Sequence, residues 1–251
     1  GAVRCAAGAH LVKANSYQHV VEGVGSPVAP SELCWALIMS ASRNIPSYVS
    51  NLLNDKWQCS GGLGLGRTLK GLTLGIWGYR KIGKRIARFA KAFDMDVLVW
   101  GSEGSRNAAV ADGFAAARSK TDIFANADIL TLHLRLNDAT RGCVTRKDLQ
   151  QMKSDSLFVN TSRSGLVEKG ALYKELSANR EKRAAVDVYD VEPANSKNEP
   201  LLTLPNVTAL PHLGYVELNS YELYFNAAFE NVVAYAEGAP QNLVTVRSLL
   251  H

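Results

Sequence analysis

The sequence lacks the cysteine spacings of zinc sites and of disulfide frameworks. Its four cysteines, Cys5, Cys34, Cys59 and Cys143, are far apart, and no Cys-x-x-Cys pair occurs. Isolated cysteines in a chain of this length are typical of reduced thiols in an intracellular protein. We therefore expect no metal site and a cytoplasmic location.

The sequence also has no hydrophobic run that would cross a bilayer and no ordered regions of a signal peptide. Its longest apolar stretch, Leu33 to Ala41, is well short of the roughly 20 residues that a membrane helix needs. Basic residues are scattered, and their densest group, Arg80 to Lys91, follows a helical pattern that predicts a solvated face. Neither a membrane nor a nucleic acid is expected as a partner.

What the sequence does contain is a regular alternation of short apolar and longer amphipathic segments from Leu72 onward. The apolar segments predict strands at 72–77, 96–100, 128–132, 156–160, 184–187 and 207–210. The segments between them predict helices near 81–93, 119–126, 145–152 and 168–178. Apolar strands separated by helices predict an α/β fold with a doubly wound parallel sheet.

The segments outside this alternation predict further helices and one linker. Residues 1–27 show weak periodicity, with a short strand expected at Val20-Val21. A helix is expected to begin near Pro30, with Ser31 as its N-cap and a buried stripe of Leu33, Leu37, Ile38 and Ala41. Pro46 interrupts it before a second helical piece over about 47–57, the glycine-rich segment 61–66 predicts a linker, and 215–237 predicts a long final helix.

The first strand meets a glycine turn and then a helical pattern, which is the arrangement of a dinucleotide-binding βαβ unit. The fingerprint Gly-x-Gly-x-x-Gly places a diphosphate on the helix N-terminus. This sequence has Gly78, Arg80 and Gly83 at the three glycine positions. The loop predicts a dinucleotide site in which an arginine replaces the middle glycine.

The second strand of such a unit ends with an acid that binds the adenosine ribose. Here Gly101-Ser102-Glu103 follows the strand, with Arg106 a few residues further on. Without the acid, Ser102 and Arg106 can bind a ribose 2′-phosphate, which favours NADP over NAD. The alternatives are that Glu103 serves the ribose or that no residue does.

Polar residues follow three later strands, at the edge where open α/β sheets bind ligands. An arginine, a glutamate and a histidine stand there, at Arg163, Glu192 and His212. A guanidinium binds and polarises a 2-oxo acid, and a histidine exchanges protons near neutral pH. Alone, each of the three has a structural interpretation as a surface ion pair, a solvated acid or a turn residue. Together they favour hydride transfer on a 2-hydroxy or 2-oxo acid.

Several motifs in sequence order extend this pattern. They are the glycine loop at 75–83, Leu132-His133-Leu134 with Asn137 and 140–142, Phe158 to Arg163, Ala185 to Pro193, and Leu204 to Gly214. Through them the chain resembles, from about Pro27 to its end, the D-isomer-specific 2-hydroxyacid dehydrogenases, which include D-3-phosphoglycerate dehydrogenase.

The resemblance implies a Rossmann-like NAD(P)-binding domain and a substrate that is a D-2-hydroxy acid or its 2-oxo acid, similar to 3-phosphoglycerate, glycerate or hydroxypyruvate. It implies that Arg163 binds the substrate and that Glu192 and His212 form the acid/base pair. It also implies a homodimer, formed through the nucleotide-binding domain with the 31–54 helices in the contact. Residues that match cofactor positions, together with those from the two loops above, are Gly78, Arg80, Lys81, Ile82, Gly83, Ser102, Thr161, Ser162, Asp187 and Gly214.

The chain departs from the family pattern at Arg80, at Gly101, at Ser164 after the arginine, and at its front. The family's flavodoxin-like substrate domain begins before the point that corresponds to Gly1. We therefore expect residues 1–27 to be the tail of that domain, 28–214 the dinucleotide-binding domain, and 215–251 a C-terminal helix that returns to the substrate domain. Two alternatives to an enzyme stay open, a non-catalytic dinucleotide-sensing or protein-binding relative and a truncated, inactive fragment.

Overall fold

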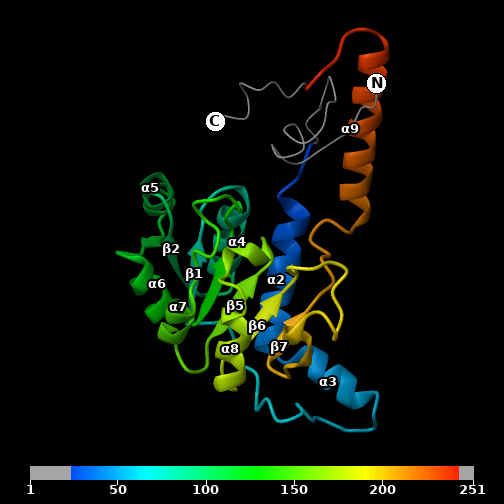
Figure 1. The fold of residues 1–251 in the computed structure, drawn as a ribbon. Coiled ribbons are helices and arrows are strands. Elements are labelled where there is room, and N and C mark those ends of the chain that lie inside the picture. Colours follow the sequence, from blue (N-terminus) through cyan, green and yellow to red (C-terminus); the bar gives the residue numbers. More distant parts are fainter. Residues whose placement is uncertain (1–23, 243–251) are drawn as a thin grey trace. The chain divides into compact units, whose positions relative to one another are not determined.

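The computed structural model describes residues 24–242 (Figure 1). The chain divides into two compact units, one of residues 30–214 and one that combines 1–29 with 215–251. The strand expected at Val20-Val21 lies outside the described residues. In the described range, all of the strands belong to the unit of residues 30–214.

The larger unit contains one seven-stranded parallel sheet in the order β3-β2-β1-β4-β5-β6-β7. The strands are β1 (Thr73–Trp77), β2 (Asp96–Trp100), β3 (Ala115–Ala116), β4 (Ile129–Leu132), β5 (Leu157–Asn160), β6 (Arg183–Val186) and β7 (Val207–Ala209). The chain runs outward from β1 to β3 and then crosses back to β4, so the strand order reverses between β1 and β4. The prediction of a doubly wound parallel sheet is confirmed.

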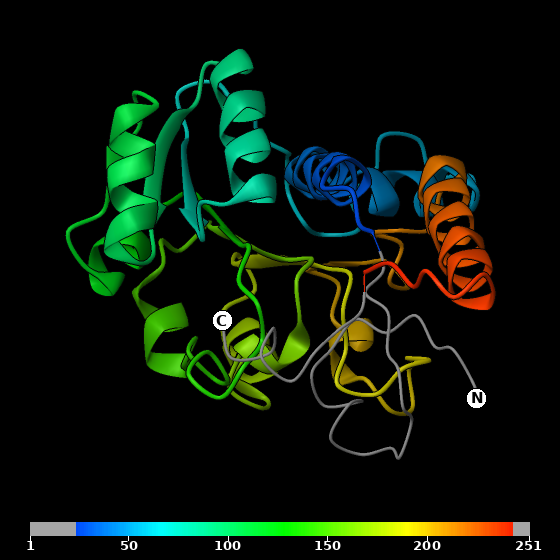
Figure 2. The ribbon, with the colours of Figure 1, turned by 90° about the horizontal axis from the view of Figure 1, so that it is seen from above.

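Helices cover both faces of this sheet. They are α2 (Val28–Ser42), α4 (Lys81–Ala92), α5 (Glu103–Ala111), α6 (Lys120–Asn126), α7 (Arg146–Gln151) and α8 (Ala171–Ala178), with 3-10 turns at Ser164–Leu166 and Pro200–Thr203. A further helix, α3 (Ile45–Leu52), buries none of its residues. Figure 2 shows α2 (blue) and α4 (teal) on one side of the sheet and α7 and α8 (green to yellow-green) on the other. The central strands β1, β4 and β5 are almost wholly buried, which explains why their sequences are mostly apolar.

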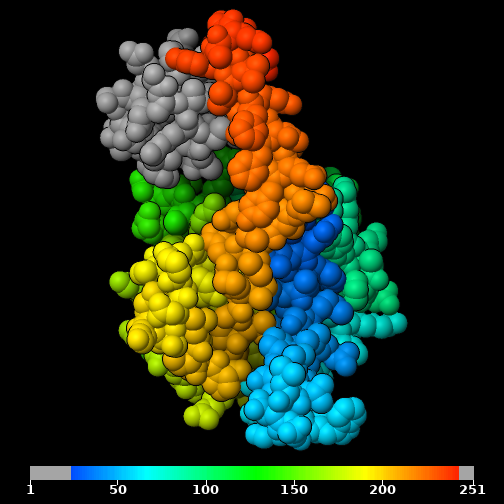
Figure 3. Space-filling model, turned by 90° about the vertical axis from the view of Figure 1, so that its right-hand side faces the viewer, coloured from blue at the N-terminus to red at the C-terminus, as the bar shows by residue number. Residues whose placement is uncertain are grey.

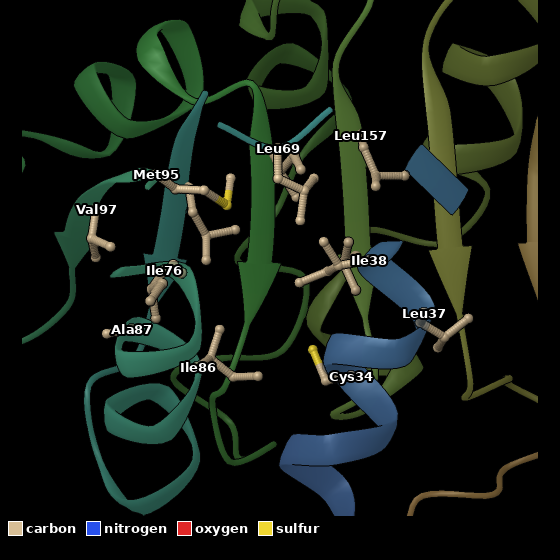
Figure 4. Packing of buried hydrophobic residues seen from close by; sticks show 14 of the residues in the cluster. Cys34, Leu37, Ile38, Leu69, Ile76, Ile86, Ala87, Met95, Val97 and Leu157 are labelled. Carbon is tan, nitrogen blue, oxygen red and sulfur yellow. The ribbon is translucent and has the colours of Figure 1, made fainter. Parts of the chain in front are cut away.

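Two apolar layers hold the helices on the sheet. One layer joins α2, α4 and α5 to the sheet through side chains such as Ile38, Ile76 and Ile86, each fully buried. Figure 4 shows this layer, with Cys34 and Leu37 of α2 in it. The other layer joins α6, α7 and α8 to the opposite face. Each fully buried aliphatic side chain contributes about 1.5–3 kcal/mol to the free energy of unfolding.

The six expected strands and four expected helices of the alternating region are present with small changes at their ends. The sequence patterns missed α5 and the two-residue edge strand β3. The α5 segment carries only one buried residue, Ala109, so its sequence has little of the periodicity that marks a helix. The edge strand is too short to produce an alternation.

The expected start of α2 is wrong. The helix begins at Val28, and Ser31 is a fully buried residue inside it. Pro30 is tolerated because residues of the first helical turn need no backbone N–H. Cys34 takes the buried position that was expected for Leu33, which is only partly buried. The second helix is also shorter than expected, since α3 ends at Leu52.

In the smaller unit, the helix expected over 215–237 is α9 (Leu218–Ala236). It begins three residues later than expected because the carboxylate of Glu217 caps it, accepting hydrogen bonds from the backbone N–H groups of Asn219 and Ser220. Tyr221, Phe225 and Phe229 stack one turn apart along this helix, with ring centroids 6.2 and 6.5 Å apart. In the described residues no helix is long and apolar enough to cross a membrane.

Candidate active site

The sequence-predicted site residues of the larger unit lie at the carboxyl ends of its parallel strands. Gly78 follows β1, Ser102 follows β2, and Thr161 follows β5. Asp187 follows β6, and His212 comes three residues after β7. The strand order reverses between β1 and β4, and a crevice at such a switch point is where doubly wound sheets bind ligands.

The glycine loop requires glycine at two of its three fingerprint positions because of the protein's own backbone. Gly78 has a positive φ of 104°, and a Cβ there would lie 2.4 Å from the carbonyl oxygen of His133. A Cβ at Gly83 would lie 2.1 Å from the carbonyl oxygen of Gly78. This packing brings the N-terminus of α4 against the end of β1, with the amides of its first turn at the switch point.

Arg80, at the middle position, is the N-cap residue of α4. Its φ of −109° and ψ of −150° are extended values that any residue adopts, and its side chain is exposed. Among the described residues it has no ion-pair or hydrogen-bond partner for its guanidinium. Lys81 is exposed as well, whereas Ile82 is partly buried against the α2–α4 apolar layer. The protein backbone therefore does not require glycine at position 80.

The residues after β2 already have intramolecular partners. Ser102 caps α5, and its Oγ accepts a hydrogen bond from the N–H of Ser105 at 3.3 Å. Arg106 donates from Nη1 to the carbonyl oxygen of Gly101 at 2.6 Å, and its guanidinium lies 4.8 Å from the centroid of the Trp100 ring. A guanidinium and a hydroxyl thus stand together at the end of β2, where the sequence predicted a contact with the ribose.

The turn after β5 is built around the buried side chain of Asn160. Its Nδ2 donates to the carbonyl oxygen of Arg163 at 2.9 Å, and its Oδ1 accepts from the N–H of Ser162 at 3.1 Å. The Ser162 hydroxyl donates to the carbonyl oxygen of Leu132 at 2.7 Å, which ties the turn to the end of β4. The side chain of Arg163 extends from this fixed turn and is exposed to solvent.

A fully buried carboxylate, Asp187, holds the segment after β7. Its two oxygens accept hydrogen bonds from the N–H groups of Leu213 at 2.7 Å and Gly214 at 3.0 Å. Burial raises the pKa of Asp187, and these two hydrogen bonds oppose that shift. His212, directly before the two donors, has a positive φ of 55°, an uncommon conformation for a residue with a Cβ. The clamp therefore fixes the backbone on which the histidine stands.

The structure brings Glu192 and His212 together although they are 20 residues apart in sequence. His212 Nδ1 lies 3.0 Å from Oε1 and 2.8 Å from Oε2 of Glu192. Glu192 Oε1 also accepts from the N–H of Tyr189 at 3.2 Å. Partial burial raises the pKa of Glu192, but the contacts with His212 and Tyr189 and the charge of Arg163 outweigh it, so the pKa is lowered. The carboxylate is ionised at neutral pH and orients the imidazole.

Three polar contacts beside this edge were not predicted from the sequence. His133 Nε2 lies 3.2 Å from Thr131 Oγ1, which lies 3.5 Å from the sulfur of Cys34. Burial lowers the pKa of His133 to about 4. The Tyr79 hydroxyl donates to Asp112 at 2.9 Å, bracing the glycine loop. The contacts of Thr131 with Cys34 and of Tyr79 with Asp112 join segments that are distant in sequence, so no local pattern marks them. Among the described residues no cluster of ligands would hold a metal ion.

Comparison with known proteins gives a consistent family match. The model of the D-isomer specific 2-hydroxyacid dehydrogenase NAD binding domain matches residues 35–214. Glyoxylate reductase of Aeropyrum pernix is 36% identical over 222 residues, covering 86% of this chain and 66% of that protein. D-3-phosphoglycerate dehydrogenase of Methanocaldococcus jannaschii is 34% identical over 189 residues, covering 75% of this chain and 35% of that protein.

Solved structures are similar over the same region. The phosphoglycerate oxidoreductase from Vibrio cholerae superposes with a TM-score of 0.86 at 64% identity, covering 88% of this chain and 70% of that one. An acyclic imino acid reductase in complex with NADPH and D-Arg superposes with a TM-score of 0.75 at 26% identity, covering 90% of this chain and 71% of that one. The chain spans about two thirds or less of the length of the curated relatives cited above.

Proposed function

The chain belongs to the D-isomer specific 2-hydroxyacid dehydrogenase family, and on this premise we propose that it interconverts a D-2-hydroxy acid and the corresponding 2-oxo acid by hydride exchange with NAD(P). The observation that carries the proposal is the Glu192–His212 pair, held at the carboxyl edge of the sheet by the Asp187 clamp. The named activities of the relatives, glyoxylate reductase and D-3-phosphoglycerate dehydrogenase, indicate a small acid of that class.

The dinucleotide fits the residues that are present. Gly78 and Gly83 allow the N-terminus of α4 to pack against the end of β1 at the switch point, where a diphosphate can meet helix amides. Lys81, Ile82, Thr161, Ser162 and Gly214 are assigned to the remainder of the cofactor site. Bound there, the nicotinamide supplies the hydride acceptor or donor.

The protein's own groups bind the acid and move the proton. The guanidinium of Arg163 binds the substrate carboxylate and polarises the carbonyl. His212 takes the hydroxyl proton at Nε2 during oxidation and returns it to the carbonyl oxygen during reduction. Glu192, bound to Nδ1, orients the ring and stabilises its protonated form. A hydroxy acid thus loses one proton to His212 and one hydride to the cofactor.

NADP is proposed as the preferred cofactor. Gly101 leaves no acid at the end of β2 to repel a 2′-phosphate, and Ser102 and Arg106 stand beside it. A relative of the same fold is described in complex with NADPH. Arg106→Ala is expected to weaken NADPH binding by about tenfold, since a charged hydrogen bond is lost, and to leave NADH binding within about twofold.

A homodimer is proposed through α2 and α3. Apolar side chains of α3 and the following segment are exposed, including Ile45 at 47%, Leu53 at 80% and Trp57 at 78%. Figure 3 shows this segment, in light blue, uncovered on the face in view. An exposed apolar group of this kind marks an interaction surface. Leu53→Asp with Trp57→Ser is expected to give a monomer in sedimentation, whereas retention of the dimer contradicts this interface.

Two further assignments complete the proposal. Residues 1–27 and 215–251 are assigned to a substrate-binding part, which is supported by the grouping of both ends in one compact unit. The cytoplasm is proposed as the location, because Cys34, Cys59 and Cys143 are unpaired thiols.

Titration with NADH and NADPH, followed by nicotinamide fluorescence, tests the proposal directly. We expect binding of at least one dinucleotide and oxidation of the bound cofactor on addition of glyoxylate or hydroxypyruvate. Binding without turnover of any 2-oxo acid would favour a non-catalytic relative. Binding of neither dinucleotide would favour an inactive fragment.

A further inference from the structure

The segment that follows β4 runs directly against the glycine loop. β4 is the neighbour of β1 in the sheet, on the far side of the switch point from β2. The position of a Cβ on Gly78 would be 2.4 Å from the carbonyl oxygen of His133 and 3.2 Å from Cδ2 of Leu134. Arg135 is the next residue. It therefore borders the same crevice as the N-terminus of α4.

Alternation along this segment indicates which face of the sheet Arg135 occupies. Leu132, Leu134 and Leu136 all pack into the layer under α6, α7 and α8. Thr131 and His133 are directed to the other face, where Thr131 contacts Cys34 of α2. β4 ends at Leu132, but Leu134 and Leu136 stay in the layer under α6, α7 and α8 beyond it, so we expect the side chain of Arg135 between them on the other side. Arg135 is thus expected on the face of the sheet that α2 and α4 cover, where the N-terminus of α4 lies.

The Arg135 backbone is fixed while its charge is not compensated. The Thr140 hydroxyl donates to the carbonyl oxygen of Arg135 at 2.6 Å, and Thr140 in turn is held by Asn137. The Arg135 side chain is exposed and forms no ion pair with any residue in the range 24–242. Arg80 and Lys81, across the crevice, also lack an acidic partner in that range. Three cations therefore border the crevice, and none of them forms an ion pair with a residue of the described part of the chain.

We propose that Arg135 is a further dinucleotide-binding residue, which holds the diphosphate of NAD(P) from the β4 side of the crevice. The inference rests on the proposed function. A guanidinium donates two parallel hydrogen bonds to phosphate oxygens, which suits a diphosphate lying on the amides of α4. The contact of the Arg135 guanidinium with the diphosphate would replace the close backbone contact that a glycine at position 80 would allow.

The test compares Arg135→Ala with Arg43→Ala. Arg43 is likewise exposed and without an ion pair in the part of the chain that the structure describes, but it follows the C-terminal end of α2, away from the crevice. Nicotinamide fluorescence gives the Kd of each variant for NADH and for NADPH. We expect Arg135→Ala to raise both Kd values by about tenfold, since charged hydrogen bonds are lost. Arg43→Ala is expected to leave both within about twofold.

The ratio of the two effects identifies the phosphate that Arg135 contacts. NADH and NADPH share the diphosphate, so equal weakening of both supports the proposal. Weakening of NADPH alone assigns Arg135 to the 2′-phosphate and overturns it, as does a Kd within twofold of the wild type for both cofactors. A wild type that binds neither dinucleotide overturns the proposed function itself. Equal melting temperatures of the two variants exclude unfolding as the cause.

Discussion

The two halves of the sheet's carboxyl edge are stabilised in different ways. In the β5–β7 half, buried polar side chains fix the turns: Asn160 bonds to the backbone of Ser162 and Arg163, and Asp187 bonds to the backbone after His212. In the β1–β2 half, the glycine loop is fixed by backbone packing, whereas Arg80 and Lys81 are exposed without an acidic partner in the described range. The half proposed to be catalytic is held in place by contacts within the protein, whereas the half proposed to bind the cofactor carries exposed cations that have no acidic partner among residues 24–242.

The largest expected effect is a loss of turnover without a loss of dinucleotide binding. His212→Ala removes the proposed acid/base, and turnover is expected to fall by about 10²–10⁴-fold. The Kd for the dinucleotide is expected to change little. Steady-state turnover of a 2-oxo acid and nicotinamide fluorescence measure the two quantities on the same preparation. Turnover near the wild-type rate would exclude His212 as the acid/base.

The next largest effect is expected at Asp187, whose hydrogen bonds to the segment after β7 are proposed to hold His212 in place. Asp187→Ala leaves the partly buried N–H groups of Leu213 and Gly214 without this acceptor, which is expected to cost about 1–3 kcal/mol of the free energy of unfolding. Turnover is expected to fall as well, because His212 loses its fixed backbone. Urea unfolding and turnover measure both. Asp187→Asn keeps one acceptor oxygen, so its free energy of unfolding should lie between those of the wild type and of the alanine variant. An unchanged free energy of unfolding in the alanine variant would show that these hydrogen bonds do not stabilise the fold.

A smaller effect tests the cofactor half at the middle glycine position. Arg80 adopts an ordinary backbone conformation with an exposed side chain, so we expect it to pair with the diphosphate rather than to fill its place. Arg80→Gly is then expected to raise the Kd for NADH by several-fold, about the value of one partly exposed charged contact. A lower Kd in fluorescence titration would show that the arginine obstructs the site.

The smallest effect concerns the pH dependence of stability at His133, between the two halves. Burial lowers its pKa to about 4 from an ordinary value of 6.5. Between these values the unfolded chain binds a proton that the folded chain does not, so the folded state loses stability as the pH falls through this window. His133→Gln is expected to make melting temperature less dependent on pH there. An unchanged dependence would place the acid sensitivity elsewhere.

The sequence predicted the parts of the fold whose periodicity is strong. Apolar strands such as β4 and the helix α4 stand out because one chemical pattern runs through each of them. The helix α5 was missed because it buries a single residue, and Ser31 was misassigned because the helix extends past Pro30 to Val28. Local patterns cannot show how far tertiary packing extends a helix.

The candidate site was predictable as a set of residues but not as a set of contacts. Placement after strands brought Arg163, Glu192 and His212 to one edge, since parallel strands end on the same side. The double contact of Asp187 with the segment after β7 was not foreseen, and neither was the brace from Tyr79 to Asp112. Such contacts join segments that are distant in sequence, and no spacing rule encodes them.

The close contacts at Gly78 and Gly83 show which glycines of the motif the fold itself requires, and which position can instead depend on ligand binding. Gly78 and Gly83 are required by neighbouring carbonyl groups of the same chain, so a descendant that had stopped binding a dinucleotide would still keep them in order to fold. Arg80 has extended dihedral angles and an exposed side chain, so the backbone does not require glycine at position 80. The outer two glycines are therefore signatures of the fold, whereas the residue at the middle position can differ, as Arg80 does here, without disturbing the backbone of the loop.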